Sequence, residues 1–224
     1  MKSGIWDALG FVPYRSGLVI QDRVADERAR DLRPDTLLLL EHPPTITLGR
    51  RASGAEVLWD AERLERAGIA VERVSRGGAA TLHVPGQLVG YAIVRLAHGG
   101  RAVRALVAGL EALLLDVARS FGLCADSRAG HPGVWVGQRK LASIGIEVRR
   151  GISRHGFALN VDADLTSFRA IVPCGVPGLE MTDLSREAGA TICMAEASDA
   201  VVRAWRARFG KMEKETWNEL EGTR

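Results

Sequence analysis

One cysteine of the 224-residue chain lies where a substrate could reach its thiol. Cys174 follows a short apolar run and stands between Pro173 and Gly175 in the segment AIVPCGVPG. The flanking proline and glycine predict a turn at the thiol, and glycine leaves one side of it open. A thiolate in that position can act as a nucleophile. Taken alone, however, a cysteine is more often a small core residue.

Lys140 is the residue best suited to assist such a nucleophile. It lies in the segment RKLASIG, where strand alternation would place it on one face with Ala142 and Ile144. Apolar surroundings favour the neutral, basic form of a lysine, and a lysine near a cysteine favours the thiolate. From spacing alone, a lysine that reaches water from a strand edge is the more common arrangement.

The pattern of strands and helices around these residues predicts an α+β fold, a single domain with a mixed sheet flanked by helices. Residues 1–224 are expected to form one catalytic domain with its core over about 30–210. The charged tail, residues 211–224, is expected to fray. Hydrophobic periodicity predicts the remaining elements. Strands are expected over 36–42, 69–78, 88–96, 133–136, 139–148 and 151–161, and helices over 60–68, 101–122 and 197–210.

Composition narrows the class of protein. The net charge is +3 and no dense run of lysine and arginine is present, so we expect no nucleic-acid partner. A mildly positive chain suits an acidic partner met transiently. No apolar run is long enough to span a membrane, and the first ten residues lack the apolar core of a signal peptide. We therefore expect a cytoplasmic protein that does not bind membranes.

The cysteine count is odd, and the spacing of Cys124, Cys174 and Cys193 fits no zinc motif. We expect free thiols in a reducing compartment, and neither a metal nor a cofactor. Cys124 and Cys193 are expected to be inert.

Four segments, taken together and in order, resemble the lipoyl/octanoyl transferases, the octanoyl-[acyl-carrier-protein]:protein N-octanoyltransferases of lipoate biosynthesis. They are EHPPTITLGRRA (41–52), RGGAATLHVPGQLVGY (76–91), GVWVGQRKLASIGIEVRRGISRHGFALNV (133–161) and IVPCG (171–175). The resemblance covers residues 36–185, about two thirds of the chain. It implies a fold like the catalytic core of biotin and lipoate ligases.

The resemblance also implies a reaction. Cys174 falls on the family's nucleophile and Lys140 on the lysine that activates it. Cys174 would take an octanoyl group from octanoyl acyl-carrier protein as an acyl-enzyme, without ATP. A lysine of a lipoyl domain, in a 2-oxoacid dehydrogenase E2 subunit or the glycine cleavage H protein, would then accept it. The residues implied to line the acyl group are Arg76, Gly77, Gly78, Ala79, Ala80, Thr81, Leu82, His83, Ser143, Ile144, Gly145, Gly156, Phe157 and Ala158.

The chain departs twice from the usual family pattern RGGxxTYHGPGQ. Leu82 stands where tyrosine is usual, which removes a ring and a hydroxyl expected beside the pocket. Val84 stands where glycine is usual, which adds bulk and disfavours a positive φ. These changes predict an altered chain-length preference or turnover.

Several alternatives remain open. His83 suits ligand contact and simple loop hydrogen bonding equally, whereas His42 and His155 are expected to be structural. Leu82 and Val84 favour a non-catalytic paralogue that binds acyl-carrier protein or lipoyl domains, but retention of both Cys174 and Lys140 argues against it, because a binder needs no thiol–amine pair. A lipoate–protein ligase would need no cysteine there, and a thioesterase would use the same acyl-enzyme with water. We expect a monomer, because no long apolar stripe is left over.

Overall fold

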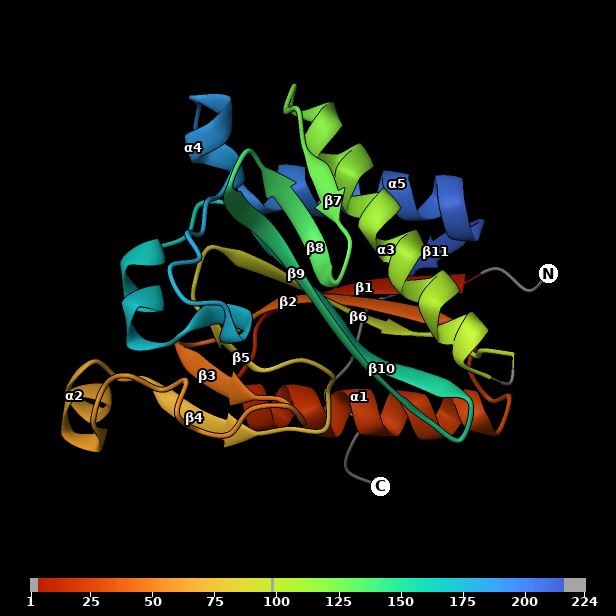
Figure 1. Cartoon of the computed structure of the whole chain (residues 1–224). Helices are drawn as coiled ribbons and strands as arrows, with labels where there is room; N and C mark the ends of the chain where they lie inside the picture. The colour runs from red at the N-terminus through yellow and green to blue at the C-terminus, as the bar shows by residue number, and fades with distance from the viewer. Residues whose placement is uncertain (1–3, 98, 216–224) are drawn as a thin grey trace.

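The computed structural model describes residues 4–97 and 99–215, and an eight-stranded mixed sheet forms its centre (Figure 1). The strand order is β11-β1-β2-β6-β10-β9-β8-β7. Strand β1 runs parallel to β2 and β11, and the other neighbours are antiparallel. The bounds are β1 Gly4–Phe11, β2 Thr36–Glu41, β6 Gln87–Ile93, β7 Asp126–Arg128, β8 His131–Val136, β9 Arg139–Arg149, β10 Ile152–Asn160 and β11 Met212–Lys214.

The four leucines of β2 explain how the sheet is covered. Side chains alternate along a strand, so Leu37 and Leu39 pack with one apolar cluster and Leu38 and Leu40 with another. The first cluster lies under α3 (Gly100–Ser120) and α5 (Met194–Phe209), and the second faces α1 (Tyr14–Ala29). Figure 1 shows α1 on the opposite side of the sheet from α3 and α5. A central strand covered on both faces reads as a continuous apolar run.

A smaller sheet with the order β4-β3-β5 stands beside the large one (Figure 1). Its own apolar cluster includes Ile46, Leu64 and Leu82, and the chain just before Cys174 joins it through Phe168 and Ile171. The smaller sheet therefore positions the turn that carries the cysteine. The remaining bounds are β3 Thr45–Leu48, β4 Ala70–Arg73, β5 Ala80–His83, α2 Ala61–Arg66, η1 Leu165–Ala170, η2 Pro173–Gly175 and α4 Leu184–Ala188.

The predicted α+β fold with a mixed sheet is confirmed, as are the predicted strands and helices, with shifted ends. Helix α2 begins after Asp60, whose carboxylate accepts a hydrogen bond from Arg63 N at 2.8 Å. The chain leaves that helix through Gly68, whose φ is +64°. The hairpin between β8 and β9 turns at Gly137, with φ +55°.

The prediction that the tail frays is wrong for its first part. Met212–Lys214 forms β11, which pairs with β1, and Glu215 N donates to Trp6 O at 2.8 Å. These backbone hydrogen bonds order a segment for which the charged sequence had predicted fraying. Residues 216–224 lie outside the described residues. Within 4–97 and 99–215, no helix has the length and apolar character needed to cross a membrane.

Candidate active site

The turn at Cys174 forms as predicted. Cys174 has left-handed backbone angles, φ 57° and ψ 13°, and Gly175 follows with φ +70°. Bonds from Gly175 N to Val172 O (3.1 Å) and from Val176 N to Pro173 O (3.0 Å) close the turn. A left-handed cysteine costs about 1–2 kcal/mol. Backbone strain of this kind concentrates at functional sites, and the thiol stays half-buried rather than sealed in the core.

Lys140 reaches that thiol. Its Nζ lies 3.3 Å from Cys174 Sγ, although the two residues are 34 positions apart. Lys140 is only 2% exposed, so the alternative of a lysine that reaches water from the strand edge is wrong. The Nζ atom lies 5.1 Å from the centre of the Trp135 ring.

A β-bulge in β9 aims Lys140 at the cysteine. On β8, Val134 pairs with Ala142 and the next residue, Trp135, pairs with Lys140, so Leu141 is an extra residue. Neighbours on β8 point to opposite faces, and their partners Lys140 and Ala142 therefore do so too. The prediction that Lys140 shares a face with Ala142 and Ile144 is wrong for this reason. Bulges commonly redirect a side chain beside an active site.

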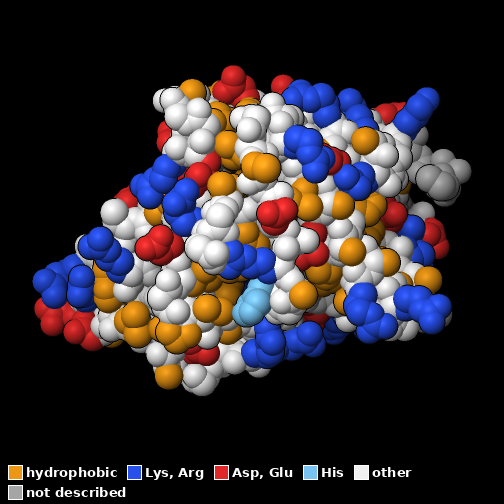
Figure 2. Space-filling view, turned by 45° about the horizontal axis from the view of Figure 1, so that its top comes forward, with side chains coloured by type: hydrophobic (Ala, Val, Ile, Leu, Met, Phe, Trp, Pro, Cys, Tyr) orange, Lys and Arg blue, Asp and Glu red, His pale blue; other side chains and the backbone are white. Residues whose placement is uncertain are grey.

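Lys140 and Cys174 line one pocket of about 220 Å³. Figure 2 shows the hollowed face, where hydrophobic side chains gather with basic and histidine side chains near the centre. Thirteen of the fourteen residues that the resemblance implied around an acyl group line this pocket, drawn from the loop and strand over 76–83 and from β9 and β10. They are Arg76, Gly77, Gly78, Ala79, Ala80, Thr81, His83, Ser143, Ile144, Gly145, Gly156, Phe157 and Ala158.

Leu82 is the exception. Its side chain is fully buried in the cluster of the smaller sheet and does not line the pocket. Alternation along β5 explains this, because Thr81 and His83 face the pocket and the residue between them faces away. Val84 is buried in the same cluster, and its φ is not positive. Neither departure from the family pattern changes the wall of the pocket.

The pocket also has walls that the sequence did not predict. Tyr14 comes from α1, Val107 from α3, and Tyr91 from β6. Tyr14 and Val107 lie outside the segments that carry the family resemblance, whereas Tyr91 ends the segment 76–91, and the packing of distant elements brings all three to the site. The further lining residues are Arg51, Val89, Gly130, His131, Pro132, Ile146 and His155.

Arg76 holds the glycine loop over the pocket. The guanidinium is 7% exposed and donates to Thr47 O, Thr47 Oγ1 and Gly77 O. Burial lowers its pKa, which the charges of Tyr14 and Cys174 oppose. A Cβ on Gly49 would lie 2.5 Å from Gly78 O, so glycine is required where the loop meets β3. Arg76 is thus a positive charge fixed among neutral oxygens beside the pocket.

The buried histidines are neutral. Burial lowers the pKa of His42 to about 4 and that of His155 to about 3, and it places the pKa of His83 well below its ordinary value. His42 bridges Val12 O and the Tyr91 hydroxyl, a structural role as predicted. His83 both lines the pocket and bonds through Nδ1 to Gln87 Oε1 at 2.7 Å. The hydrogen-bonding role of His83 is therefore confirmed, and its contact with a ligand stays a prediction.

Within the described parts of the chain, no three histidine, cysteine, aspartate or glutamate side chains gather closely enough to hold a metal ion. The three cysteines are free; Cys124 and Cys193 are exposed.

Most of the chain matches one family of catalytic domains. The family described as "Lipoyl protein ligase A/B catalytic domain" matches residues 13–206, and the chain belongs to it. Within this family the chain is homologous to octanoyltransferases, which are acyltransferases. It is 44% identical over 197 residues to the octanoyltransferase of Roseiflexus sp. strain RS-1, covering 87% of this chain and 82% of that one. It is 45% identical over 193 residues to the octanoyltransferase of Geobacter sulfurreducens, covering 86% and 79%.

Solved structures agree on the fold. A lipoate-protein ligase A bound with ATP superimposes with a TM-score of 0.78 at 17% identity, covering 99% of this chain and 92% of that one. The bipartite lipoate protein ligase of Thermoplasma acidophilum, described with its E2 lipoyl domain, gives 0.77 at 16% identity, covering 100% and 90%. At these identities the likeness concerns the fold alone.

Proposed function

We propose that this protein is an octanoyltransferase that carries octanoyl from acyl-carrier protein to a lysine of lipoyl domains through a thioester on Cys174. The observation that supports this most directly is the 3.3 Å contact between Lys140 Nζ and Cys174 Sγ in a largely apolar pocket. The identity to octanoyltransferases of two organisms supports the acyl group. The acceptors would be E2 subunits of 2-oxoacid dehydrogenases and the glycine cleavage H protein.

In the first half-reaction, neutral Lys140 takes the Cys174 proton, and the thiolate attacks the octanoyl carbonyl carbon. The bond from that carbon to the carrier's sulfur breaks, and the departing thiolate takes the proton back from Lys140. Octanoyl is then held on Cys174 as a thioester. Thioester exchange is nearly balanced, so this step needs no ATP.

In the second half-reaction, the amine of the acceptor lysine attacks the Cys174 thioester. Lys140, now neutral, accepts a proton from that amine as general base. An amide forms, the carbon–sulfur bond breaks, and Cys174 returns to the thiolate beside the Lys140 ammonium. Amide formation makes the overall transfer favourable.

The pocket suits an uncharged aliphatic chain. Small residues on β9 and β10, among them Gly145, Gly156 and Ala158, leave room between larger walls such as Phe157. Each methylene buried there contributes about 0.8 kcal/mol. The reason to favour a non-catalytic paralogue is weakened, since Leu82 and its neighbour Val84 point away from the pocket.

The test is an intact-mass measurement after mixing the protein with octanoyl acyl-carrier protein without ATP. We expect one hydroxylamine-labile octanoyl adduct, mapped to Cys174, that passes to a lipoyl domain. Cys174→Ser should abolish the adduct, and Lys140→Ala should slow its formation by about 10²–10⁴-fold.

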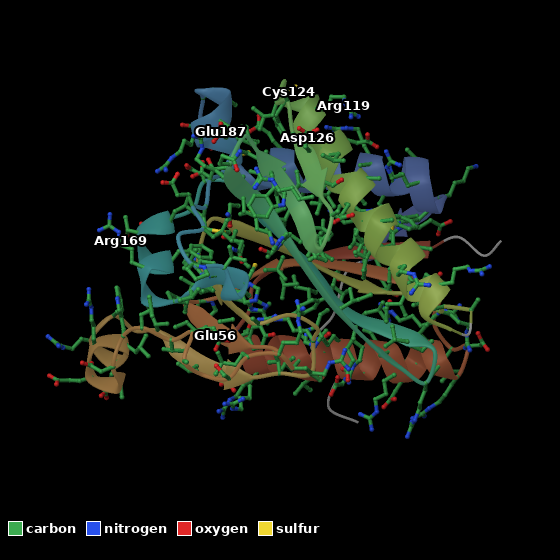
Figure 3. All side chains as sticks on the ribbon, in the orientation of Figure 1. Glu56, Arg119, Cys124, Asp126, Arg169 and Glu187 are labelled. Atoms are coloured by element: carbon green, nitrogen blue, oxygen red, sulfur yellow. The ribbon has the colours of Figure 1, made fainter. Side chains whose placement is uncertain are left out.

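The matched control is Cys124→Ser. That cysteine is exposed near Arg119 and Asp126, where α3 ends (Figure 3), and its replacement should leave the adduct intact. A folded wild-type protein that forms no adduct, or one that needs ATP to acylate the lipoyl domain, would refute the proposal and favour a binding paralogue or a ligase.

A further inference from the structure

The backbone of Lys140 is held from outside the β9 ladder. Lys140 faces Trp135 of β8, but on the other side of β9 the pairing with β10 ends at Ala142. Instead, Lys140 N donates to Glu180 O at 2.9 Å, and Lys140 O accepts from Thr182 N at 3.0 Å. Both backbone groups of the lysine therefore depend on the position of the segment 180–182.

The segment 180–182 follows the nucleophile closely in the chain. Only five residues separate Cys174 from Glu180. The chain leaves the turn at Cys174 and pairs with Lys140 through Met181 in an isolated parallel bridge. Whatever fixes residues 180–182 against the large sheet therefore fixes the lysine relative to the thiol.

Asn160, the last residue of β10, makes that attachment. Its Nδ2 donates to Thr182 O at 2.8 Å, and both residues are almost completely buried. On its other side, Thr182 donates through Oγ1 to Glu187 of α4, at the edge of the molecule in Figure 3. The side chain of Asn160 thus bonds to the backbone of the segment that connects Cys174 to the peptide holding Lys140.

A line of buried amides fixes the orientation of Asn160. Its Oδ1 accepts from Gln87 Nε2 at 2.8 Å, and Gln87 Nε2 also donates to Leu82 O. Gln87 Oε1 is therefore an acceptor, and it receives the Nδ1 proton of His83 at 2.7 Å. The donors run in one direction from His83 through Gln87 and Asn160 to Thr182 O, and hydrogen bonds aligned in this way strengthen one another.

Building on the octanoyltransferase function, we propose that Asn160 is a positioning residue for the Lys140–Cys174 pair. It joins the pocket wall at His83 to the peptide that holds Lys140, and so keeps Nζ within reach of Sγ. Asn160 does not line the pocket, so its effect on the reaction is indirect. A displacement of about 1 Å in an active site can cost about 10²-fold in rate.

The test compares Asn160→Ala with Ser153→Ala. Ser153 lies on the same strand, is fully buried, and bonds to Ala92 O and Val94 N at the far end from the pair. Two quantities are measured on proteins shown to be folded by circular dichroism. They are the single-turnover rate of octanoyl transfer to Cys174, and the pH midpoint of Cys174 alkylation by iodoacetamide with Cys124 and Cys193 replaced by serine.

Asn160→Ala should lower transfer by about 10²-fold and move the alkylation midpoint to higher pH, because the thiolate loses its nearby ammonium. Ser153→Ala should keep the wild-type rate and midpoint at a similar loss of stability. Wild-type behaviour of Asn160→Ala, or an equal loss in Ser153→Ala, would overturn the proposal.

If Asn160→Ala does not fold, Asn160→Asp carries the test. It keeps the volume and the acceptor for Gln87 but cannot donate to Thr182 O when ionised, so the same two shifts are expected, and their absence refutes the role. The two proposals fail differently. A wild-type protein that transfers no octanoyl overturns the enzymatic function, while the alkylation midpoint depends only on the thiol and amine and still reports on Asn160.

Discussion

Gly133 offers the most direct way to move Lys140 without replacing it. Its φ is +135°, and a Cβ added there would lie 2.2 Å from Ala142 O and 2.7 Å from Lys140 Cε. Real Cβ contacts stay above 3.0 Å, so the Gly133→Ala variant must shift β8 or β9 by almost 1 Å. The backbone angle adds strain of about 1–3 kcal/mol.

We therefore expect Gly133→Ala to lose roughly 1–3 kcal/mol of unfolding free energy and about 10²-fold in the rate of Cys174 acylation. Gly137→Ala is the matched control. Gly137 lies in the turn of the same hairpin, also with positive φ (+55°), but nothing lies within 4 Å of its added Cβ. That variant should lose stability yet keep the acylation rate.

The assay is single-turnover octanoyl transfer, with urea unfolding of the same samples. If Gly133→Ala acylates as fast as Gly137→Ala at a temperature where both are folded, the lysine does not depend on the close packing around the bulge. That result would refute the reasoning from the bulge. A loss in both variants would instead assign the effect to the hairpin as a whole.

Two further predictions concern stability and the departure from the family pattern. Leu82→Tyr should destabilise the protein by about 1–3 kcal/mol through overpacking and should slow the transfer of every acyl chain alike. Transfer rates with octanoyl and decanoyl donors measure this, and a changed chain-length preference would contradict it. The neutral, buried His42, His83 and His155 should lower stability in mild acid, because the unfolded chain takes up protons near pH ~6.5 before the folded protein does. Between about pH 6.5 and 5, each of these three histidines contributes a fall in unfolding free energy of up to ~1.4 kcal/mol per pH unit. Urea unfolding curves measure this fall, and a flat profile contradicts the neutrality of the three side chains.

The elements were predictable where local pattern decides them. The leucines of β2, the capped start of α2 and the stripe of α3 all carry signals within one segment. Strand β11 has no such signal, because its charged sequence becomes a strand only through pairing with β1. Helix α1 likewise has a weak apolar face, and its Tyr14 reaches the pocket through tertiary packing.

The candidate site was likewise predictable only in part. The turn at Cys174 follows from Pro173 and Gly175, but the direction of Lys140 does not follow from its own strand. An extra residue reverses every later side chain of a strand, and only the register with β8 shows that Leu141 is extra. The prediction that Leu82 lines the pocket was wrong for a related reason. A family pattern gives a position in the sequence, whereas alternation along β5 decides which side of the strand that position faces.

The nucleophile and its base are attached to different parts of the core. The chain before Cys174 packs into the cluster of the smaller sheet through Ile171, and the chain after Lys140 packs into the main core through Leu141. The 3.3 Å contact between the two side chains spans the boundary between these clusters. A change of volume on either side can therefore alter the contact without touching the pocket. The buried bond from Asn160 to Thr182 O crosses from the large sheet to the segment that follows Cys174, and it opposes such movement where the reaction is most sensitive to it.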